Sequence, residues 1–89
     1  MNIINATNLN NKAREFRNAG NLIEAARLYL AAQRTAIQCR SAKREDLAFS
    51  AHCGAVLTAD RILKTSLDNN ERSEAGRIKA ESNYIFRSR

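Results

Sequence analysis

Apolar residues recur at three- and four-residue spacing along most of the chain, and this spacing predicts helices rather than strands. The broadest apolar stripe lies between Leu22 and Arg40, where many of the residues are alanine. A broad stripe predicts a helix with neighbours on two sides, and alanines let those neighbours approach closely. A narrower stripe precedes it and predicts an outer helix that starts between Asn5 and Asn8 and ends near Ala19.

These two segments meet at a short turn that has the residues such a turn needs. Gly20 stands where a helix C-terminus favours a positive φ, which glycine adopts without steric cost. Asn21 is a good N-cap for the next helix, and Glu24 can reach back to the N–H of the cap in a variant of the capping box. Stop, turn and start signals so close together predict an αα-hairpin.

A polar break follows the second segment, and a third helix is predicted from about Glu45 to Leu67. It carries two apolar stripes, more than one face of a bundle needs. Gly54 lies in its middle, where glycine costs up to about 1 kcal/mol relative to alanine, and predicts a close helix crossing. The first stripe is Phe49, Cys53, Val56, Leu63 and Leu67, interrupted by Asp60, and the second is Ala48, Ala51, Ala55, Ala59 and Ile62.

Residues 68–70 provide the next break, because aspartate and asparagine favour turns and helix caps. The remainder, from Glu71 to Arg89, is helical in character but sparsely apolar. Either it forms a separate fourth helix, or the third helix continues into it. The sequence therefore predicts an all-α fold, with an antiparallel three-helix bundle over residues 1–68 and a basic helical extension over residues 69–89.

Composition agrees with one small helical domain. The chain has 89 residues, no proline and three glycines, and a domain of this size buries only a modest core. No apolar run approaches the roughly 18 residues that span a bilayer, and the first residues lack the basic start and long apolar segment of a secretory signal. The formal charge of +6 favours an anionic partner, such as nucleic acid, acidic lipid or an acidic peptide.

The residues that could carry chemistry are few. Cys39 and Cys53 are predicted to be small buried residues in a reducing compartment, because their offset in a helical hairpin makes a disulfide unfavourable. His52 is the only histidine and does not share a helix face with Cys53, so no metal site is predicted. Nothing marks a base for a cysteine nucleophile, and the glycines form no phosphate-binding loop. We therefore predict no enzymatic activity and no cofactor.

The hairpin corner resembles two known helical families. The family motif is carried by Ala13, Phe16, Ala19, Gly20, Asn21, Glu24, Ala25, Ala26, Tyr29 and Ala32. Their spacing is similar to the first hairpin of tetratricopeptide (TPR) repeats, and more closely to the MIT (microtubule-interacting and trafficking) domain. TPR arrays need several repeats of about 34 residues, whereas MIT domains are three-helix bundles with a long third helix. The basic helical continuation is similar to the MIT proteins that serve the class III phosphatidylinositol 3-kinase complex in autophagy.

This resemblance implies a cytoplasmic protein-interaction module. MIT domains take a short helix or extended strand of a partner into grooves beside the third helix, and tails of ESCRT-III proteins are the usual ligands. For this chain the resemblance implies partners from the trafficking, endosomal or autophagy machinery, including subunits of the PI3-kinase complex. It also leaves open a location at the periphery of endosomal or autophagic membranes. In many members an acidic residue of the third helix pairs with a ligand arginine, and Asp60 lies in about the right part of this helix.

The second stripe of the third helix predicts a groove between this helix and a neighbour. Its small residues would let a partner helix approach, and charges at the edge would set the register. Alternatively the chain's own segment from Glu71 to Phe86 covers the stripe, with or without displacement by a ligand, since Ile78 and Ile85 are spaced to do so. Asp60 either contacts the ligand or forms a salt bridge, for example with Lys64. The predicted groove residues are Ala51, Ala55, Ala59, Asp60, Arg61 and Lys64.

A second function class stays open on the basis of charge. A small basic helical protein could bind nucleic acid or an acidic membrane surface through its Arg and Lys side chains. Acidic residues are mixed among the basic ones, and no recognition helix follows a short turn, which argues against sequence-specific DNA binding. The basic residues concerned are Arg27, Arg34, Arg61, Lys64, Arg72, Arg77 and Lys79, which otherwise form a solvated face.

Overall fold

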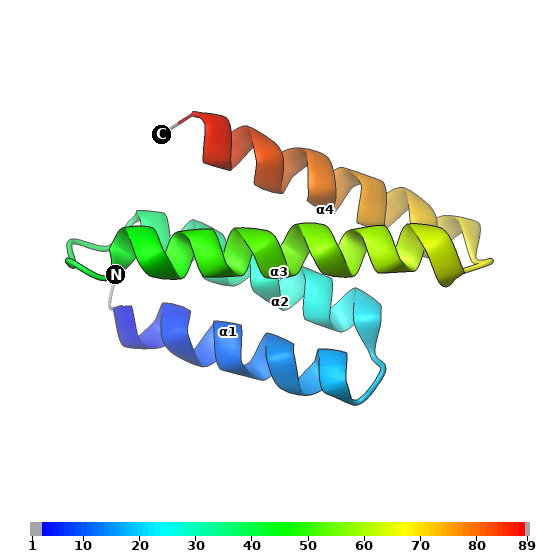
Figure 1. Ribbon diagram of the computed structural model, residues 1–89, viewed down its shortest axis with the longest axis horizontal. Coiled ribbons are helices and arrows are strands. Elements are labelled where there is room, and N and C mark those ends of the chain that lie inside the picture. Colours follow the sequence, from blue (N-terminus) through cyan, green and yellow to red (C-terminus); the bar gives the residue numbers. More distant parts are fainter. Residues whose placement is uncertain (1–2, 89) are drawn as a thin grey trace.

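The computed structural model describes residues 3–88 and contains four helices, α1 (Ile3–Asn18), α2 (Leu22–Ile37), α3 (Arg44–Thr65) and α4 (Asn69–Arg87). No strand occurs in this range, so the all-α prediction is confirmed. Successive helices run in opposite directions, so α2 and α4 are parallel to each other (Figure 1). The fourth segment is a separate helix, and α1 starts earlier than the sequence predicted.

Helix α2 is the centre of the arrangement, because it packs against each of the other three helices. Helices α1 and α4 lie on opposite sides of the α2–α3 pair (Figure 1). α1 and α3 barely contact each other, so α1 packs mainly against α2. The first three helices therefore do not form a closed three-helix bundle. None of the helices in residues 3–88 has the length and apolar character that crossing a membrane requires.

The turn between α1 and α2 is a Schellman motif at Gly20. The φ of Gly20 is +87°, as predicted, and its N–H donates to the carbonyl of Arg17 at 3.0 Å. The Asn21 N–H donates to the carbonyl of Phe16 at 2.9 Å, which completes the pattern of bonds that closes a helix C-terminus. The carbonyls at the end of α1 are thereby satisfied within the turn.

The predicted capping box at this turn is wrong. The side chain of Asn21 makes no capping hydrogen bond. Glu24 has no reason to fold back on Asn21, because the Asn21 N–H is already bonded to Phe16. The Glu24 carboxylate instead lies 3.1 Å from Nη1 of Arg27, one helical turn further along α2.

Local side chains explain why α3 and α4 are separate helices. The carboxylate of Asp68 accepts hydrogen bonds from the N–H groups of Asn70, at 2.8 Å, and Glu71, at 3.3 Å, and so caps the start of α4. The guanidinium of Arg72 donates to the carbonyls of Leu63 and Ser66 near the end of α3. Both helix termini at this break therefore have partners for their backbone groups.

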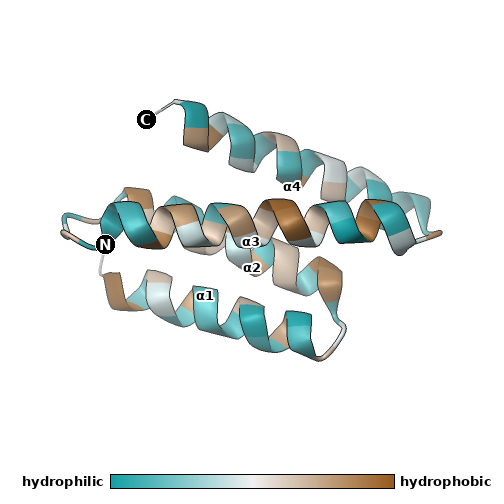
Figure 2. Ribbon diagram, viewed as in Figure 1, coloured by the Kyte–Doolittle hydropathy of each residue, from teal (hydrophilic) through white to brown (hydrophobic). Residues whose placement is uncertain are grey.

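The core consists mostly of alanines with a few large side chains. One cluster joins all four helices, and its largest buried members are Tyr29, Leu30, Ile62 and Ile78. Figure 2 shows apolar residues concentrated along α3, whereas α4 is predominantly hydrophilic. The small side chains bring the helix backbones close together. Buried apolar residues are more numerous in α2 and α3 than in α4.

The close helix crossing predicted at Gly54 is present. A Cβ atom placed on Gly54 would lie 2.5 Å from two ring carbons of Tyr29. The Tyr29 ring is 3% exposed, and the guanidinium carbon of Arg17 lies 5.8 Å from its centroid, within the range of a cation–π contact. The ring of Tyr29, on α2, thus contacts both α1 and α3.

Candidate functional site

The predicted groove on α3 is closed in the folded chain. Ala51, Ala55 and Ala59 are completely buried, so they do not line an open surface, and this part of the prediction is wrong. Ala55 and Ala59 belong to the core cluster that includes Ala75 and Ile78 of α4. The alternative given above, in which the segment after residue 70 covers the stripe, describes the arrangement found. Burial follows from the apolar stripe, which is wide enough for both α2 and α4.

The charged residues of the predicted groove have different positions. Lys79 of α4 donates a hydrogen bond of 2.7 Å to the carboxylate of Asp60, so Asp60 pairs across the α3–α4 seam and not with Lys64. Arg61 and Lys64 are exposed. Among residues 3–88, neither forms an ion pair with α4. The structure therefore brings only Asp60 of these three residues to the seam that α4 covers.

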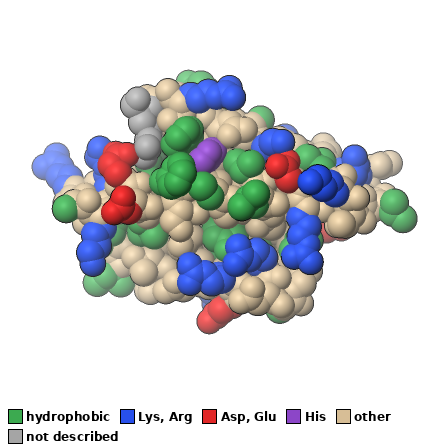
Figure 3. Space-filling model, viewed as in Figure 1, with side chains coloured by type: hydrophobic (Ala, Val, Ile, Leu, Met, Phe, Trp, Pro, Cys, Tyr) green, Lys and Arg blue, Asp and Glu red, His purple; other side chains and the backbone are tan. Residues whose placement is uncertain are grey.

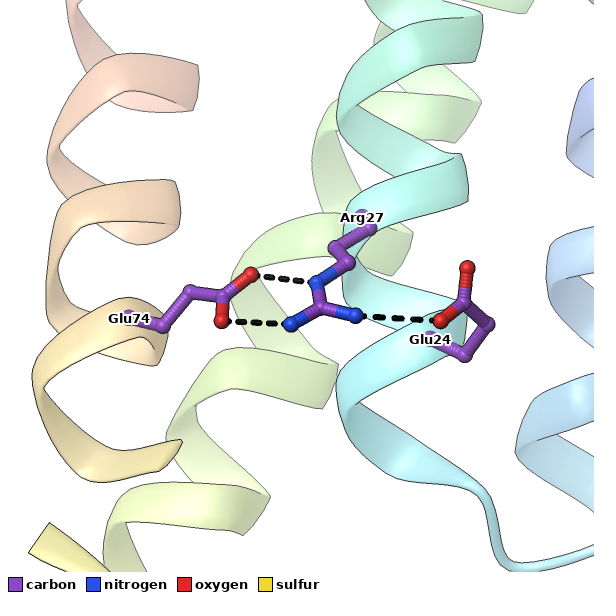
Figure 4. A network of polar contacts seen from close by, with 3 residues as sticks. All are labelled: Glu24, Arg27 and Glu74. Carbon is purple, nitrogen blue, oxygen red and sulfur yellow. Dashed lines mark hydrogen bonds and ion pairs between the residues drawn. The ribbon is translucent and has the colours of Figure 1, made fainter. Parts of the chain in front are cut away.

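A ladder of ion pairs holds α4 against α2. The Arg27 guanidinium donates through Nε and Nη2 to the two carboxylate oxygens of Glu74, the second at 2.7 Å, and through Nη1 to Glu24 (Figure 4). Arg34 pairs with Glu81 through Nη2 and one carboxylate oxygen, seven residues further along both helices. Because α2 and α4 are parallel, equal steps along both helices keep the two pairs in register. The ladder fixes the position of α4 along α2.

The cleft between α2 and α4 lies along this ladder and has a volume of about 200 Å³. Leu30 and Ile78 line its apolar part. Arg77 stands beside the ladder as an additional cation. The full lining is Arg27, Leu30, Arg34, Glu74, Arg77, Ile78 and Glu81. The cleft therefore has charged side chains at its rim and a small apolar surface at its base.

The electrostatics of the ladder follow from its geometry. Hydrogen bonds from Arg27 hold the pKa of Glu74 below its ordinary value, and the positive charges of Arg27 and Arg77 act in the same direction, while burial opposes them. The hydrogen bond and charge of Glu74 likewise raise the pKa of Arg27. Glu74 is therefore ionised in the folded chain down to a lower pH than in the unfolded chain.

Lowering the pH should remove the contribution of Glu74 to stability. Since its pKa is depressed by folding, this contribution is present above the ordinary carboxyl pKa of about 4.3 and is lost as the pH falls through the folded value. Thermal unfolding of the wild type and of Glu74→Gln should be compared by circular dichroism from about pH 7 to about pH 2. We expect a lower Tm for the variant at neutral pH and equal values at the acidic end. A difference that stays constant with pH would contradict this assignment.

A buried hydrogen-bond network joins α2, α3 and α4 next to the ladder. Nε2 of Gln33 donates to the backbone carbonyl of Ser82 at 3.1 Å, which assigns Oε1 to the other side of the amide. Oε1 accepts from the Ser82 hydroxyl at 2.6 Å. That hydroxyl has no second proton, so it accepts from Nδ1–H of His52, 2.8 Å away. The network thus assigns the tautomer of His52 and satisfies three buried polar groups.

Aromatic rings cover the outer end of this network. The His52 ring stacks on Phe86, with centroids 4.5 Å apart and an interplanar angle of 3°. Phe49 lies 5.8 Å from Phe86 and is 50% exposed. Figure 3 shows hydrophobic side chains gathered around the single histidine on this face of the molecule. The rings shield the His52–Ser82 contact from water while leaving an aromatic surface exposed.

The two cysteines are both free thiols. The thiol of Cys39 is buried and lies 3.1 Å from the carbonyl of Thr35. Cys53 is half-buried on α3 rather than fully buried as predicted. In the part of the chain that the structure describes, no three His, Cys, Asp or Glu residues come close enough to hold a metal ion.

Several residues between α2 and α4 were not predicted from the sequence. The pairs Arg27 with Arg34 and Glu74 with Glu81 share a seven-residue spacing, and this shared spacing was the available signal for two helices in register. No comparable signal exists for Gln33, because a lone glutamine on an apolar stripe carries no information about its partner.

Comparison with models of protein families, with curated proteins and with solved structures found no match to this chain.

Proposed function

We propose that the chain is a protein-interaction module that accepts a helix in the groove between α2 and α3, and that α4 fills this groove until a partner helix replaces it. The observation that carries this proposal is the way α4 is held. The helix lies in the groove through matched charges and one polar network, with little apolar area of its own.

The apolar contribution of α4 to the groove is small. Only Ala75, Ile78 and Ser82 of α4 are buried, with Ile85 packed against the core at its edge. On the groove side, Leu30 and Ile62 belong to the same cluster. Because the free energy of helix docking scales with buried apolar area, a helix that buries more apolar area at the edge of the groove, at the position of Ile85, would bind more tightly than α4.

The ion pairs set where a helix binds rather than how strongly. The side chains of Arg27 and Arg34 are about half exposed, and ion pairs of that exposure contribute little net stability. They do fix register and direction, because a helix shifted along the groove would lose both pairs at once. Arg27 and Arg34 therefore fix the register of an incoming helix.

The pattern of α4 describes the expected partner. The partner helix should carry an acidic residue at the position equivalent to Glu74 and a second acidic residue seven positions later. It should carry an isoleucine-like residue four positions after the first acid, and small residues one and eight positions after it. Such a helix would lie parallel to α2. The net charge of +6 would add a long-range attraction for an acidic partner. Helical motifs of endosomal or autophagy proteins, implied by the resemblance to MIT domains, are the proposed partner class.

The competing interpretation as a binder of nucleic acid or acidic membranes has less support. Arg27, Arg34 and Lys79 are paired with carboxylates of the same chain, and Arg72 is directed at backbone carbonyls. These four side chains are less available to phosphates than the net charge suggests. We therefore favour a protein partner over a phosphate surface.

The test uses α4 itself as the probe. A fluorescein-labelled peptide of residues 68–88 is added to the full chain carrying Glu74→Arg and Glu81→Arg, and binding is measured by anisotropy. The substitutions place like charges opposite Arg27 and Arg34, which should loosen the tethered α4 and open the groove. We expect the peptide to bind this variant at least about tenfold more tightly than it binds the wild type, whose groove is filled.

Two controls make the result specific. A peptide with Ile78→Asp should not bind, because it would place a carboxylate at a buried position. The full chain with Glu15→Arg, a reversal on the exposed side of α1, should bind the peptide as weakly as the wild type. Circular dichroism must show that the variant keeps its other helices. Equal binding of the two peptides by the opened variant would refute the proposal.

A further inference from the structure

The outer face of α3 carries a second pattern that the groove does not use. Six residues on this face alternate at spacings of four and three, as in one seam of a coiled coil. They are Asp46, Ser50, Cys53, Leu57, Asp60 and Lys64. None of the six is fully buried, and Leu57 is 66% exposed. This seam lies on the side of α3 away from its buried alanines. At its edges Asp60 pairs with Lys79 of α4, and Asp46 and Ser50 line a hollow together with Thr7 of α1, while Leu57 at its centre stays exposed.

The seam is self-complementary about its midpoint at residue 55. Asp46 and Lys64 are equidistant from this point at opposite ends. Neither forms an ion pair among the described residues. Closer to the midpoint, Ser50 corresponds to Asp60, and Cys53 corresponds to Leu57. If two α3 helices pack antiparallel, Asp46 of each copy therefore meets Lys64 of the other, and the apolar residues meet each other in the middle.

We propose that this seam is the interface of a homodimer in which two copies of the chain pack α3 against α3 in antiparallel orientation. A two-fold axis makes such an interface isologous, so that one favourable contact always occurs twice. The seam lies outside the α2–α3 groove, so this proposal goes beyond the proposed function and does not depend on it.

Charge selects the antiparallel arrangement and a second copy as occupant. A parallel pair would place Asp46 against Asp46 and Lys64 against Lys64, and like charges across an interface are strongly disfavoured. Arg61 adds a second base near Lys64. The apolar centre is small, since only Cys53 and Leu57 occupy it, while Phe49 and Val56 flank it. Reversible association is expected for an interface of this size.

Charge reversal tests the pairing directly. Sedimentation equilibrium of the full chain over a range of concentrations should show a monomer–dimer equilibrium. Asp46→Lys and Lys64→Asp should each raise the dissociation constant by about tenfold or more, because each places two like-charged pairs in the dimer. The double variant restores opposite charges at both ends and should return the constant to within a few-fold of the wild type. Leu57→Glu should abolish dimerisation, and Tyr84→Glu, at a site of α4 that is 71% exposed, should not change it.

A change in the stability of α3 cannot explain why the dissociation constant of the double variant should return towards that of the wild type. Asp46 is in the first turn of α3 and Lys64 is in the last, where both favour the helix dipole. The double variant therefore has the least favourable dipole interactions of the set, yet should dimerise better than either single variant. A monomeric wild type at millimolar concentration, or a double variant that dimerises no better than the single ones, would overturn the proposal.

Discussion

Replacing Ala55 and Ala59 with glutamate is expected to unfold the protein. Both alanines are completely buried in the cluster that joins α3 to α2 and α4. Each glutamate would bring a charge into a site without a partner and a side chain too large for the space. Burial of an unpaired ionised group costs many kcal/mol, and even a protonated carboxyl costs several. The whole stability of a small domain is about 5–15 kcal/mol, so the double variant should have no cooperative melting transition.

The matched control is on α1. Asn5→Glu with Asn11→Glu introduces the same two side chains at exposed positions of that helix, and surface changes of this kind are usually worth about 0.5 kcal/mol or less. Circular dichroism should show a normal melting transition for this control. A folded Ala55→Glu, Ala59→Glu variant with an unchanged Tm would mean that the stripe is open, as the sequence first predicted.

Gly54→Ala is expected to destabilise the protein, although alanine is the better helix former. In the middle of an exposed helix this change gains up to about 1 kcal/mol. Here the added Cβ would lie 2.5 Å from the ring of Tyr29, and the ring is buried where α1 and α3 meet α2. Overpacking of a core commonly costs about 1–3 kcal/mol. The net free energy of unfolding measured in urea should therefore fall.

Gly76 provides the comparison for this prediction. It also lies inside a helix, but a Cβ there would have no atom within 4 Å, so Gly76→Ala should raise stability by up to about 1 kcal/mol. In addition, Gly54→Ala should cost less in a Tyr29→Leu background than in the wild type, because the smaller side chain removes the clash. If Gly54→Ala and Gly76→Ala change stability in the same direction, the crossing at Gly54 is looser than the structure shows.

Local features of the fold could be predicted from the sequence because they depend on neighbouring residues. The glycine at the hairpin corner, the helical spacing of apolar residues and the break near Asp68 each act over a few residues. Glu24 was assigned the wrong partner, because two signals competed for the backbone N–H of Asn21. The Schellman bond to Phe16 takes it, and a sequence pattern does not rank such competitors.

The candidate site was predicted less well because it depends on which element covers which stripe. The alanines of α3 indicated a helix at close range, and the helices that cover them proved to be α2 and α4 of the same chain. Asp60 was expected to bond a ligand or Lys64, yet Lys79 reaches it because α4 runs antiparallel to α3. Such a contact depends on the register of two helices far apart in sequence, which no local pattern specifies.

The Gln33–Ser82–His52 network has a consequence for which helices the groove can accept. A helix with leucine at the position of Ser82 would bury more apolar area, but Oε1 of Gln33 and Nδ1–H of His52 would both lose their hydrogen bonds to the Ser82 hydroxyl. An unsatisfied buried polar group costs about 1–3 kcal/mol, which offsets the gain from a larger side chain. The groove therefore rejects helices that are merely more hydrophobic and discriminates in favour of those with a hydroxyl at this one position.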